Sequence, residues 1–238
     1  NALWETLPEH AFWRLNPDQL EWTTDVVVGD PAAKQHISVR PVQPHGVSEL
    51  LVCVPDHDGL FAAITSVLDE MALDVMSARV LTTNDGRSYD LFQLMDQHGE
   101  VINEVDAEEL VSRLEQATSE EQPRAPVKRK LPRRLRHFTT PPEIRFSDDP
   151  DQAGTVLHLR CTDQPGLLSR VAAAIFRQDV QVHNARIATF GERVEDTFLV
   201  SDACKELIDS GKTTSIRDLY YVTKHTIGDS RQNTFEEQ

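Results

Sequence analysis

Cysteine is scarce in this chain of 238 residues: Cys53, Cys161 and Cys204 are the three present, and no two form a Cys-x-x-Cys pair. This odd, scattered set argues against a disulfide framework and against a zinc ribbon. Long apolar runs are also missing, because runs such as residues 50–54 hold five residues, whereas a transmembrane helix needs about 20. We therefore expect a folded protein of a reducing, cytoplasmic compartment with no membrane partner.

Signals of export and of several catalytic classes are missing too. Residues 1–5 include no initiator Met and no basic or apolar region of a signal peptide, so we expect a fragment of a longer protein. The sequence has no Gly-x-Ser-x-Gly, no glycine-rich phosphate loop, no His-x-x-x-His and no Cys/His pattern that indicates a nucleophile. We therefore expect no catalytic residue and no metal ligand in this chain.

Positive charge is scarce overall but concentrated in one place. The chain has 24 Lys and Arg residues against 39 Asp and Glu residues, a net charge of −15. Seven of the 24 cations lie in residues 124–136, which hold no acidic residue, so 17 cations face 39 acidic residues elsewhere. The acidic surface argues against nucleic-acid binding. The basic run could bind RNA, act as a targeting signal or form a linker; without interleaved aromatic residues, it favours a linker lying against an acidic surface.

An internal repeat organises the sequence. At an offset of 107 residues, residues 50–60 align with residues 157–167 and share the pattern Asp-x-x-Gly-Leu. An offset shorter by one residue, after the hairpin turn, aligns Asp90 with Asp196. Matches spread over such a length indicate two copies of one structural unit.

Each copy shows the same series of elements. An apolar strand is followed by a turn, an amphipathic helix, a hairpin, a second helix and a closing strand. This βαββαβ order predicts an α+β fold of two ferredoxin-like units with antiparallel sheets, each with one face left open. The expected ranges are strands 50–54 and 156–161, helices 60–71 and 167–175, hairpins 75–95 and 180–201, second helices 107–117 and 215–218, and closing strands 143–146 and 219–227.

The repeat motifs carry a family resemblance. Residues 163–171, 182–189 and 191–198 resemble an ACT domain, a small ferredoxin-like amino-acid sensor. Gly-Glu-Arg-Val-Glu-Asp after Ala-Arg-Ile is similar to the last domain of the bifunctional PII uridylyltransferase/uridylyl-removing enzyme family. Further stretches similar to that family's C-terminal tandem ACT region are residues 3–10, 60–63, 78–86 and the basic tract 130–138.

The resemblance implies a regulatory fragment that is not itself catalytic. The family's enzymes also carry a nucleotidyltransferase domain and an HD phosphohydrolase domain, and the resemblance implies that both are absent from this chain. We therefore expect the Mg²⁺ in those domains and no cofactor here. Glutamine binding to the ACT region switches the family's enzymes from uridylylating the PII signalling protein towards removing the uridylyl group, which controls nitrogen signalling. The expected partners are thus L-glutamine, the catalytic domains in cis, and PII through the full-length enzyme.

The resemblance and the composition together predict the organisation of the chain. Aromatic residues and Asn16-Pro17, a helix start, precede the first copy, and five prolines with the basic run separate the copies. The expected parts are a helical lead-in (1–46), the first ACT core (47–119), a Pro/basic linker (120–142), a closing strand and loop (143–153), the second ACT domain (154–228) and a disordered tail (229–238).

The second copy offers the clearer ligand site. Pro165 suits a first helical turn, Gly166 allows close approach, and the helix N-terminus offers N–H groups to an α-carboxylate. Asp163 could then meet the ligand's ammonium group. Alternatively, Asp163 caps the helix and Gly166 makes the turn. In the first copy Asp58 stands where the second has Pro165, which adds negative charge at the carboxylate position.

Arginines on the second strands complete the candidate set. Arg79 and Arg186 could bind a carboxylate bidentately or could simply be solvated. The candidate ligand-binding residues are Asp163, Gln164, Pro165, Gly166, Leu167, Ala185, Arg186, Ile187, Asp56, Asp58, Gly59, Leu60 and Arg79.

Two other functions stay open. The chain could be a free-standing tandem ACT protein that senses another amino acid. It could also be part of a nucleotidyltransferase, with Asp56 and Asp58 holding Mg²⁺, although Asp163-Gln164-Pro165 does not repeat that pair of carboxylates.

Overall fold

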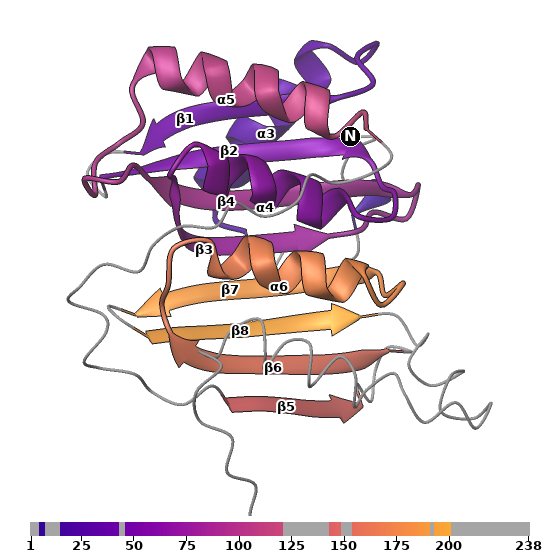
Figure 1. Ribbon diagram of the computed structural model, residues 1–238. Helices are drawn as coiled ribbons and strands as arrows, with labels where there is room; N and C mark the ends of the chain where they lie inside the picture. Colours follow the sequence, from indigo (N-terminus) through magenta and orange to yellow (C-terminus); the bar gives the residue numbers. More distant parts are fainter. Residues whose placement is uncertain are drawn as a thin grey trace, which may run out of the picture.

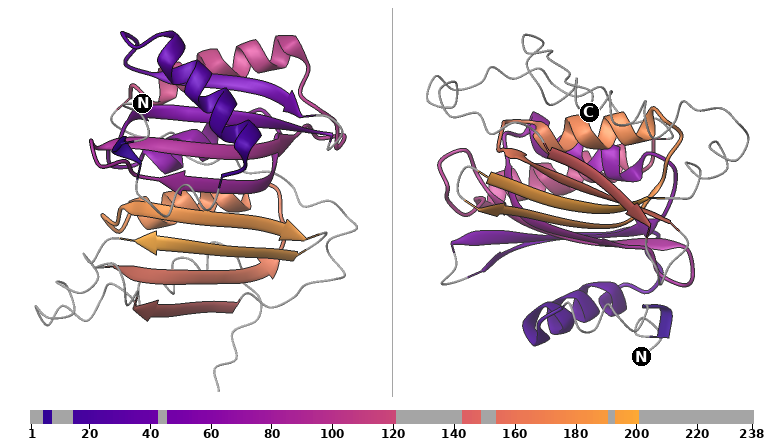
Figure 2. Two further views of the ribbon diagram at one scale, coloured as in Figure 1. Left: turned by 180° about the vertical axis from the view of Figure 1, so that it is seen from behind. Right: turned by 90° about the horizontal axis from the view of Figure 1, so that it is seen from below.

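The strands of the described residues form one antiparallel sheet (Figure 1). The computed structural model describes residues 5–7, 15–42, 46–120, 143–148, 154–190 and 193–200. Within them, eight strands lie in the order β1-β2-β4-β3-β7-β8-β6-β5. Helices α4, α5 and α6 cover one face of the sheet, and α3 lies on the other face (Figure 2). The predicted α+β class with antiparallel strands is therefore confirmed.

The first half of the sheet follows the predicted strand, helix and hairpin. Leu60, Ile64 and Leu68 bury the apolar face of the helix at residues 60–70 against the sheet. Gly86, at φ 78°, makes the hairpin turn. The elements are β1 (His36–Val42), β2 (Val47–Pro55), α4 (Leu60–Glu70), β3 (Asp74–Leu81), β4 (Arg87–Met95) and α5 (Glu104–Ala117).

The second half repeats this arrangement. Val171, Ala174 and Ile175 form the buried stripe of its helix, and Phe198 on its last described strand is fully buried. The elements are β5 (Glu143–Asp148), β6 (Thr155–Thr162), α6 (Leu167–Phe176), β7 (Val182–Phe190) and β8 (Arg193–Val200).

The two halves join edge to edge. β3 pairs antiparallel with β7, from Ser77 opposite Ala188 to Leu81 opposite Asn184, and α4 packs beside α6. The rings of Phe61 and Phe198, one from each half, meet edge to face with centroids 6.1 Å apart. The two sheets therefore pair side by side, and one apolar core serves both halves.

The order of strands along the chain differs from the predicted βαββαβ. The strand expected at residues 143–146 to close the first copy is present as β5, but it pairs with β6 of the second half. The corresponding edge position of the first half is taken by β1, which pairs with β2 and lies inside the predicted helical lead-in. Within the described residues, both halves therefore have the same order of four strands, with the edge strand coming first along the chain.

Helix α3 (Pro17–Gly29) covers the far face of the first half (Figure 2). It starts at a capping box in which Asn16 Oδ1 accepts from Gln19 N–H at 2.8 Å and Gln19 Oε1 accepts from Asn16 N–H at 3.2 Å. The expectation of an open face is thus wrong for the first half, because the aromatic lead-in supplies apolar residues to cover it. The covered face holds a second hydrophobic cluster, whose buried residues are Leu7, Leu15, Leu51, Cys53, Leu81, Tyr89 and Leu91.

Several predicted segments lie outside the described residues: the second helix at 215–218, the closing strand at 219–227, the linker from residue 121 onwards and the tail at 229–238. Cys53 and Cys161 are buried free thiols. Among the described helices, none is long and apolar enough to cross a membrane.

Candidate ligand site between the two halves

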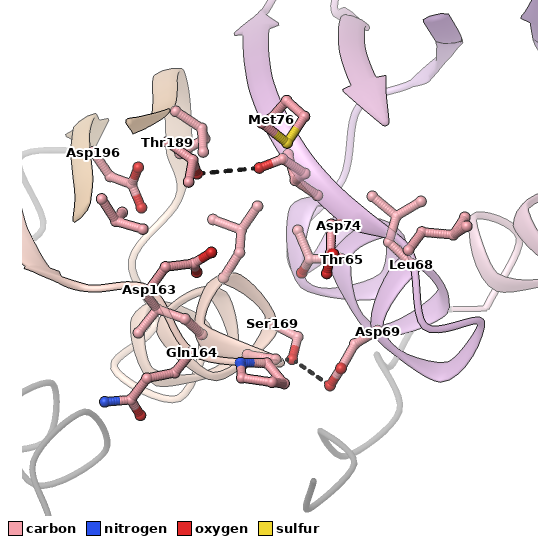
Figure 3. A pocket seen from close by; sticks show the side chains of 18 residues that line it. Thr65, Leu68, Asp69, Asp74, Met76, Asp163, Gln164, Ser169, Thr189 and Asp196 are labelled. Atoms are coloured by element: carbon pink, nitrogen blue, oxygen red, sulfur yellow. Dashed lines mark hydrogen bonds between the residues drawn. The ribbon is translucent and has the colours of Figure 1, made fainter. Parts of the chain in front are cut away.

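A cavity of about 380 Å³ opens where the two halves meet (Figure 3). Its volume falls in the usual range of small-molecule sites, about 300–1,000 Å³. Residues of α4 and β3 form one wall, and the β6–α6 loop, α6, β7 and β8 form the other. The lining residues are Thr65, Leu68, Asp69, Leu73, Asp74, Val75, Met76, Asp163, Gln164, Pro165, Gly166, Leu167, Leu168, Ser169, Ile187, Thr189, Val194 and Asp196. We call this space the interface cavity.

The N-terminus of α6 borders the interface cavity without a side-chain cap. Its N-cap residue is Gly166, in the left-handed conformation, and there is no side-chain cap hydrogen bond. By contrast, Asn16 caps α3 and Asn103 caps α5. Asp163 therefore does not cap α6, and Pro165 precedes the helix instead of occupying its first turn. Leu167 N–H donates to the Gln164 carbonyl at 2.9 Å. The other N–H groups of the first turn and the positive end of the helix dipole favour a bound anion such as a carboxylate.

The same loop packs directly on α4. Ser169 Oγ donates a hydrogen bond to Asp69 Oδ2 at 3.0 Å across the two halves. A β-carbon at position 166 would lie 2.6 Å from the same Oδ2 atom. The close neighbour of Gly166 in the structure is thus a side chain of the other half.

Four aspartates give the interface cavity its electrostatic character: Asp69, Asp74, Asp163 and Asp196. Burial raises the pKa of Asp163, and the neighbouring charge of Asp74 raises it further. Burial also raises the pKa of Asp196 to about 8, with a smaller contribution from the charge of Asp163. Among the described lining residues there is no Lys, Arg or His. The cavity therefore suits a ligand with a cationic group and hydrogen-bonding groups.

The repeat creates a second, related pocket of about 30 Å³, roughly the share of one water molecule in the liquid. At the offset of 107 residues, Phe176 takes the place of Asp69, and Gln181 takes the place of Asp74. Gln181 Nε2 also donates to Asp58 Oδ1, which closes the pocket between the halves. The lining residues are Asp56, His57, Asp58, Gly59, Leu60, Phe61, Ala62, Val80, Ser88, Asp90, Ala172, Ile175, Phe176, Val180, Gln181 and Val182.

The candidate residues predicted from sequence divide into three sets. Asp163, Gln164, Pro165, Gly166, Leu167 and Ile187 line the interface cavity. Asp56, Asp58, Gly59 and Leu60 line the small pocket. Ala185, Arg79 and Arg186 line neither pocket. Arg79 and Arg186 lie opposite each other on β3 and β7, at exposed positions of the central strand pair.

Sequence reasoning missed the wall formed by the first half and five lining residues of the second half, namely Leu168, Ser169, Thr189, Val194 and Asp196. Asp69 is an acid on the buried face of an amphipathic helix, and it is 5% exposed. Asp196 stands between Val194 and Phe198, where strand alternation places a side chain towards the core. For Asp69 and Asp196 alike, the signal in the sequence was an acidic residue at a position that faces the core. Acidic side chains are rarely buried unless they are paired or belong to a functional site.

Metal coordination was the other possibility raised by the acidic residues. Within the described ranges, no three His, Cys, Asp or Glu side chains come together as a metal site. Asp56 Oδ2 accepts a hydrogen bond from Thr82 Oγ1 at 3.1 Å, and Asp58 accepts from Gln181. The geometry therefore gives no separate support to Mg²⁺ binding by these two aspartates.

Comparisons with known proteins place the chain beside one group of enzymes. No family model matches it, and no solved structure matches it. It is 35% identical over 217 residues to the bifunctional uridylyltransferase/uridylyl-removing enzyme of Xanthomonas axonopodis pv. citri (strain 306), which covers 89% of this chain and 24% of the relative. The proteins of the same name from Methylococcus capsulatus and Psychrobacter sp. (strain PRwf-1) are 33% and 31% identical, over 84% and 91% of this chain.

The chain spans about a quarter of the length of the curated relatives it matches. The similarity extends over most of the chain and agrees with the motifs of both copies. Over that length, this chain is a homologue of a segment of the bifunctional uridylyltransferase/uridylyl-removing enzymes, which confirms the resemblance indicated by its sequence.

Proposed function

We propose that this chain is the C-terminal amino-acid-sensing region of a bifunctional uridylyltransferase/uridylyl-removing enzyme, built from two ACT-type modules, and that L-glutamine binds in the interface cavity. The observation that carries the proposal is the composition of that cavity. It combines an uncapped helix N-terminus with buried carboxylates, and both halves of the chain line it. A zwitterionic amino acid has the complementary charges.

The two charged groups of an amino acid fit different parts of the cavity. The N–H groups in the first turn of α6 would bind the α-carboxylate. Asp163, whose pKa is raised mainly by burial, would become ionised when the ligand's ammonium group replaces water beside it. Leu68, Val75 and Ile187 supply apolar walls for the aliphatic part of the side chain.

Ligand binding would regulate the parent enzyme by changing how the two halves are arranged. Since α4 and β3 form one wall and α6, β7 and β8 the other, a bound ligand favours the arrangement that closes both walls on it. A typical coupling of about 1–3 kcal/mol changes the balance of two states by roughly 5- to 150-fold. In the parent enzyme this coupling would act on catalytic domains in cis, which would use Mg²⁺, and would set the balance between uridylylation of a cytoplasmic PII protein and removal of the uridylyl group.

Isothermal titration calorimetry of the 238-residue chain tests the proposal. L-Glutamine is expected to bind, and D-glutamine and glycine are expected to bind more weakly or not at all. Gly166→Val is expected to abolish binding because its side chain fills the contact with Asp69, whereas Gly99→Val, also at positive φ but with open space around it, leaves binding intact. A folded chain that binds no amino acid at millimolar concentration would refute the proposal.

The alternatives give different results in the same experiment. A free-standing sensor would bind another amino acid more tightly than it binds L-glutamine. A metal-dependent nucleotidyltransferase fragment would be stabilised against heat by Mg²⁺ with a nucleotide, and Asp58→Asn would remove that stabilisation.

A further inference from the structure

Asp196 is the most deeply buried acidic residue of the interface cavity. It is 2% exposed and its carboxyl group lies beside Thr189 and Asp163 in the close view (Figure 3). In the described part of the chain, its one hydrogen bond comes from Ala188 N–H, at 3.4 Å from Oδ1. This is long for an N–H···O bond. A buried carboxyl group that makes so few hydrogen bonds to the protein can still donate to and accept from a ligand.

In the related pocket, the chain provides an internal donor to one of the two oxygens of the equivalent carboxyl group. Asp90 occupies the equivalent position, since Asp90 lies opposite Val52 on β2 and Asp196 lies opposite Leu159 on β6, and these partners are 107 residues apart. Ser88 Oγ donates a hydrogen bond of 2.7 Å to Asp90 Oδ1. At the position of Ser88, the second half has Val194, which has no donor. The internal partner is therefore missing only in the copy whose pocket is open.

Resting on the proposed function, we propose that Asp196 in its protonated form is the specificity-determining residue of the interface cavity, and that it recognises the side-chain carboxamide of the ligand. The Asp196 O–H would donate to the amide oxygen, and its C=O would accept from the amide N–H. A side-chain carboxylate can reproduce one of these two hydrogen bonds and brings a negative charge to a cavity whose described lining has four aspartates and no cation. Selection of glutamine over glutamate follows.

The surroundings keep Asp196 protonated near neutral pH. Burial is the main cause, and it raises the pKa of Asp196 to about 8. The titratable groups that face it are Asp163 and Cys161 from β6 and the loop after it, and Asp69 and Asp74 from α4 and β3 across the cavity. The nearest cation of α6, Arg170, donates to Gln164 Oε1 at 3.1 Å and to the Gly166 carbonyl at 3.2 Å. Of these groups, Asp163 acts on Asp196 through its charge, and it too raises the pKa of Asp196.

Calorimetry with L-glutamine and L-glutamate on the full chain tests this role. Asp196→Ala is expected to weaken glutamine binding by about tenfold or more, because the carboxamide loses both partners. Asp196→Asn, which retains a donor and an acceptor, is expected to restore much of that loss. Val194→Ser, which gives Asp196 an internal donor that competes with the ligand, is expected to weaken binding, and the matched Ser88→Val in the small pocket is not.

The pH dependence supplies an independent readout. Relative to Asp196→Asn, the affinity of the unsubstituted chain for glutamine is expected to fall by about tenfold between pH 7 and pH 9, as Asp196 ionises. The ratio cancels the titration of the ligand's own ammonium group. If glutamine binds but Asp196→Ala leaves the preference over glutamate unchanged, or the ratio is flat with pH, Asp196 does not have this role and the proposed function stands. If no amino acid binds to the unsubstituted chain, both proposals are refuted.

Discussion

Gly166 of the second half packs against Asp69 of the first half so closely that a β-carbon on Gly166 would lie 2.6 Å from Asp69 Oδ2. Asp69 is 5% exposed and its Oδ2 accepts from Ser169 Oγ, so its carboxylate has little freedom to withdraw. This contact therefore joins the start of α6 to α4 at the edge of the interface cavity.

Gly166→Ala is expected to destabilise the chain more than Gly99→Ala. Both glycines have positive φ, +69° and +78°, so both substitutions cost about 1–2 kcal/mol in left-handed backbone. Only the change at position 166 adds the clash with Asp69, which should cost about 1–3 kcal/mol more. Urea unfolding of both variants measures the difference. Equal losses of stability would show that the contact with Asp69 relaxes freely.

One ligand per chain is the expected stoichiometry, because the pocket related by the repeat holds about 30 Å³ against about 380 Å³ for the interface cavity. Asp163→Asn is expected to weaken glutamine binding by about tenfold or more, since it removes the charge opposite the ammonium group. Its counterpart in the repeat, Asp56→Asn, is expected to change the affinity by less than about twofold. Calorimetry gives both numbers. Two equal sites, or equal effects of the two substitutions, would contradict this assignment.

The core of each repeat could be predicted from sequence because local signals agree there. The Asp-x-x-Gly-Leu turn, the apolar stripes of α4 and α6 and the hairpin at Gly86 each follow from spacing of a few residues. The edge strands could not be assigned in the same way. Short strands such as β1 and β5 pair with either copy equally well by pattern alone, and tertiary contacts decide which.

The candidate site, too, could be predicted only where its residues form a local motif. The loop from Asp163 to Leu167 was identifiable because the motif is contiguous and repeated. The opposite wall, with Asp69 and Asp74, comes from the other half of the chain, and only the pairing of β3 with β7 brings it to the cavity. The substitution of Phe176 for Asp69 between the copies is visible in the sequence, but its effect on pocket volume needs the packing of α4 against α6.

Asp90→Asn is expected to stabilise the chain above neutral pH. Asp90 is 1% exposed, its Oδ2 has no hydrogen-bond partner in the described structure, and burial raises its pKa to about 8. Because this carboxyl binds its proton more tightly in the folded state, the stability that it contributes is fully present below its unfolded pKa, decreases as pH rises, and is lost once pH passes about 8.

Urea unfolding at pH 5, 7 and 9 measures this dependence. The difference in stability between Asp90→Asn and the unsubstituted chain should grow with pH by at least about 1.4 kcal/mol, the equivalent of one pKa unit. Asp25→Asn, on an exposed position of α3, is the control for the loss of one negative charge. A difference that is constant with pH would mean that Asp90 is ionised in the folded chain.

Glu49 is expected to hold α3 on the sheet. Its Oε2 accepts from Arg40 Nη2 at 2.6 Å and from Arg40 Nε at 2.9 Å, and its Oε1 accepts from Gln19 Nε2 at 2.7 Å. The Glu49 side chain is 3% exposed and that of Arg40 is 25% exposed, so the pair is only partly screened by water. Arg40 also lies over the Trp22 ring, at 4.4 Å from its centroid.

Glu49→Gln should therefore cost about 1–3 kcal/mol, since it leaves the Arg40 guanidinium without its carboxylate. The hydrogen bonds of Glu49 to Arg40 and Gln19 connect α3, β1 and β2. The loss of stability should therefore appear locally in α3 as well as in global unfolding. Hydrogen exchange should become faster in residues 17–29 while the amides of α6 keep their protection relative to global unfolding. Glu21→Gln, on an exposed position of α3, is the control and should change neither. Uniform acceleration throughout both halves would show instead that α3 and the sheet unfold as one unit, and that Glu49 stabilises the whole chain and not the docking of this helix.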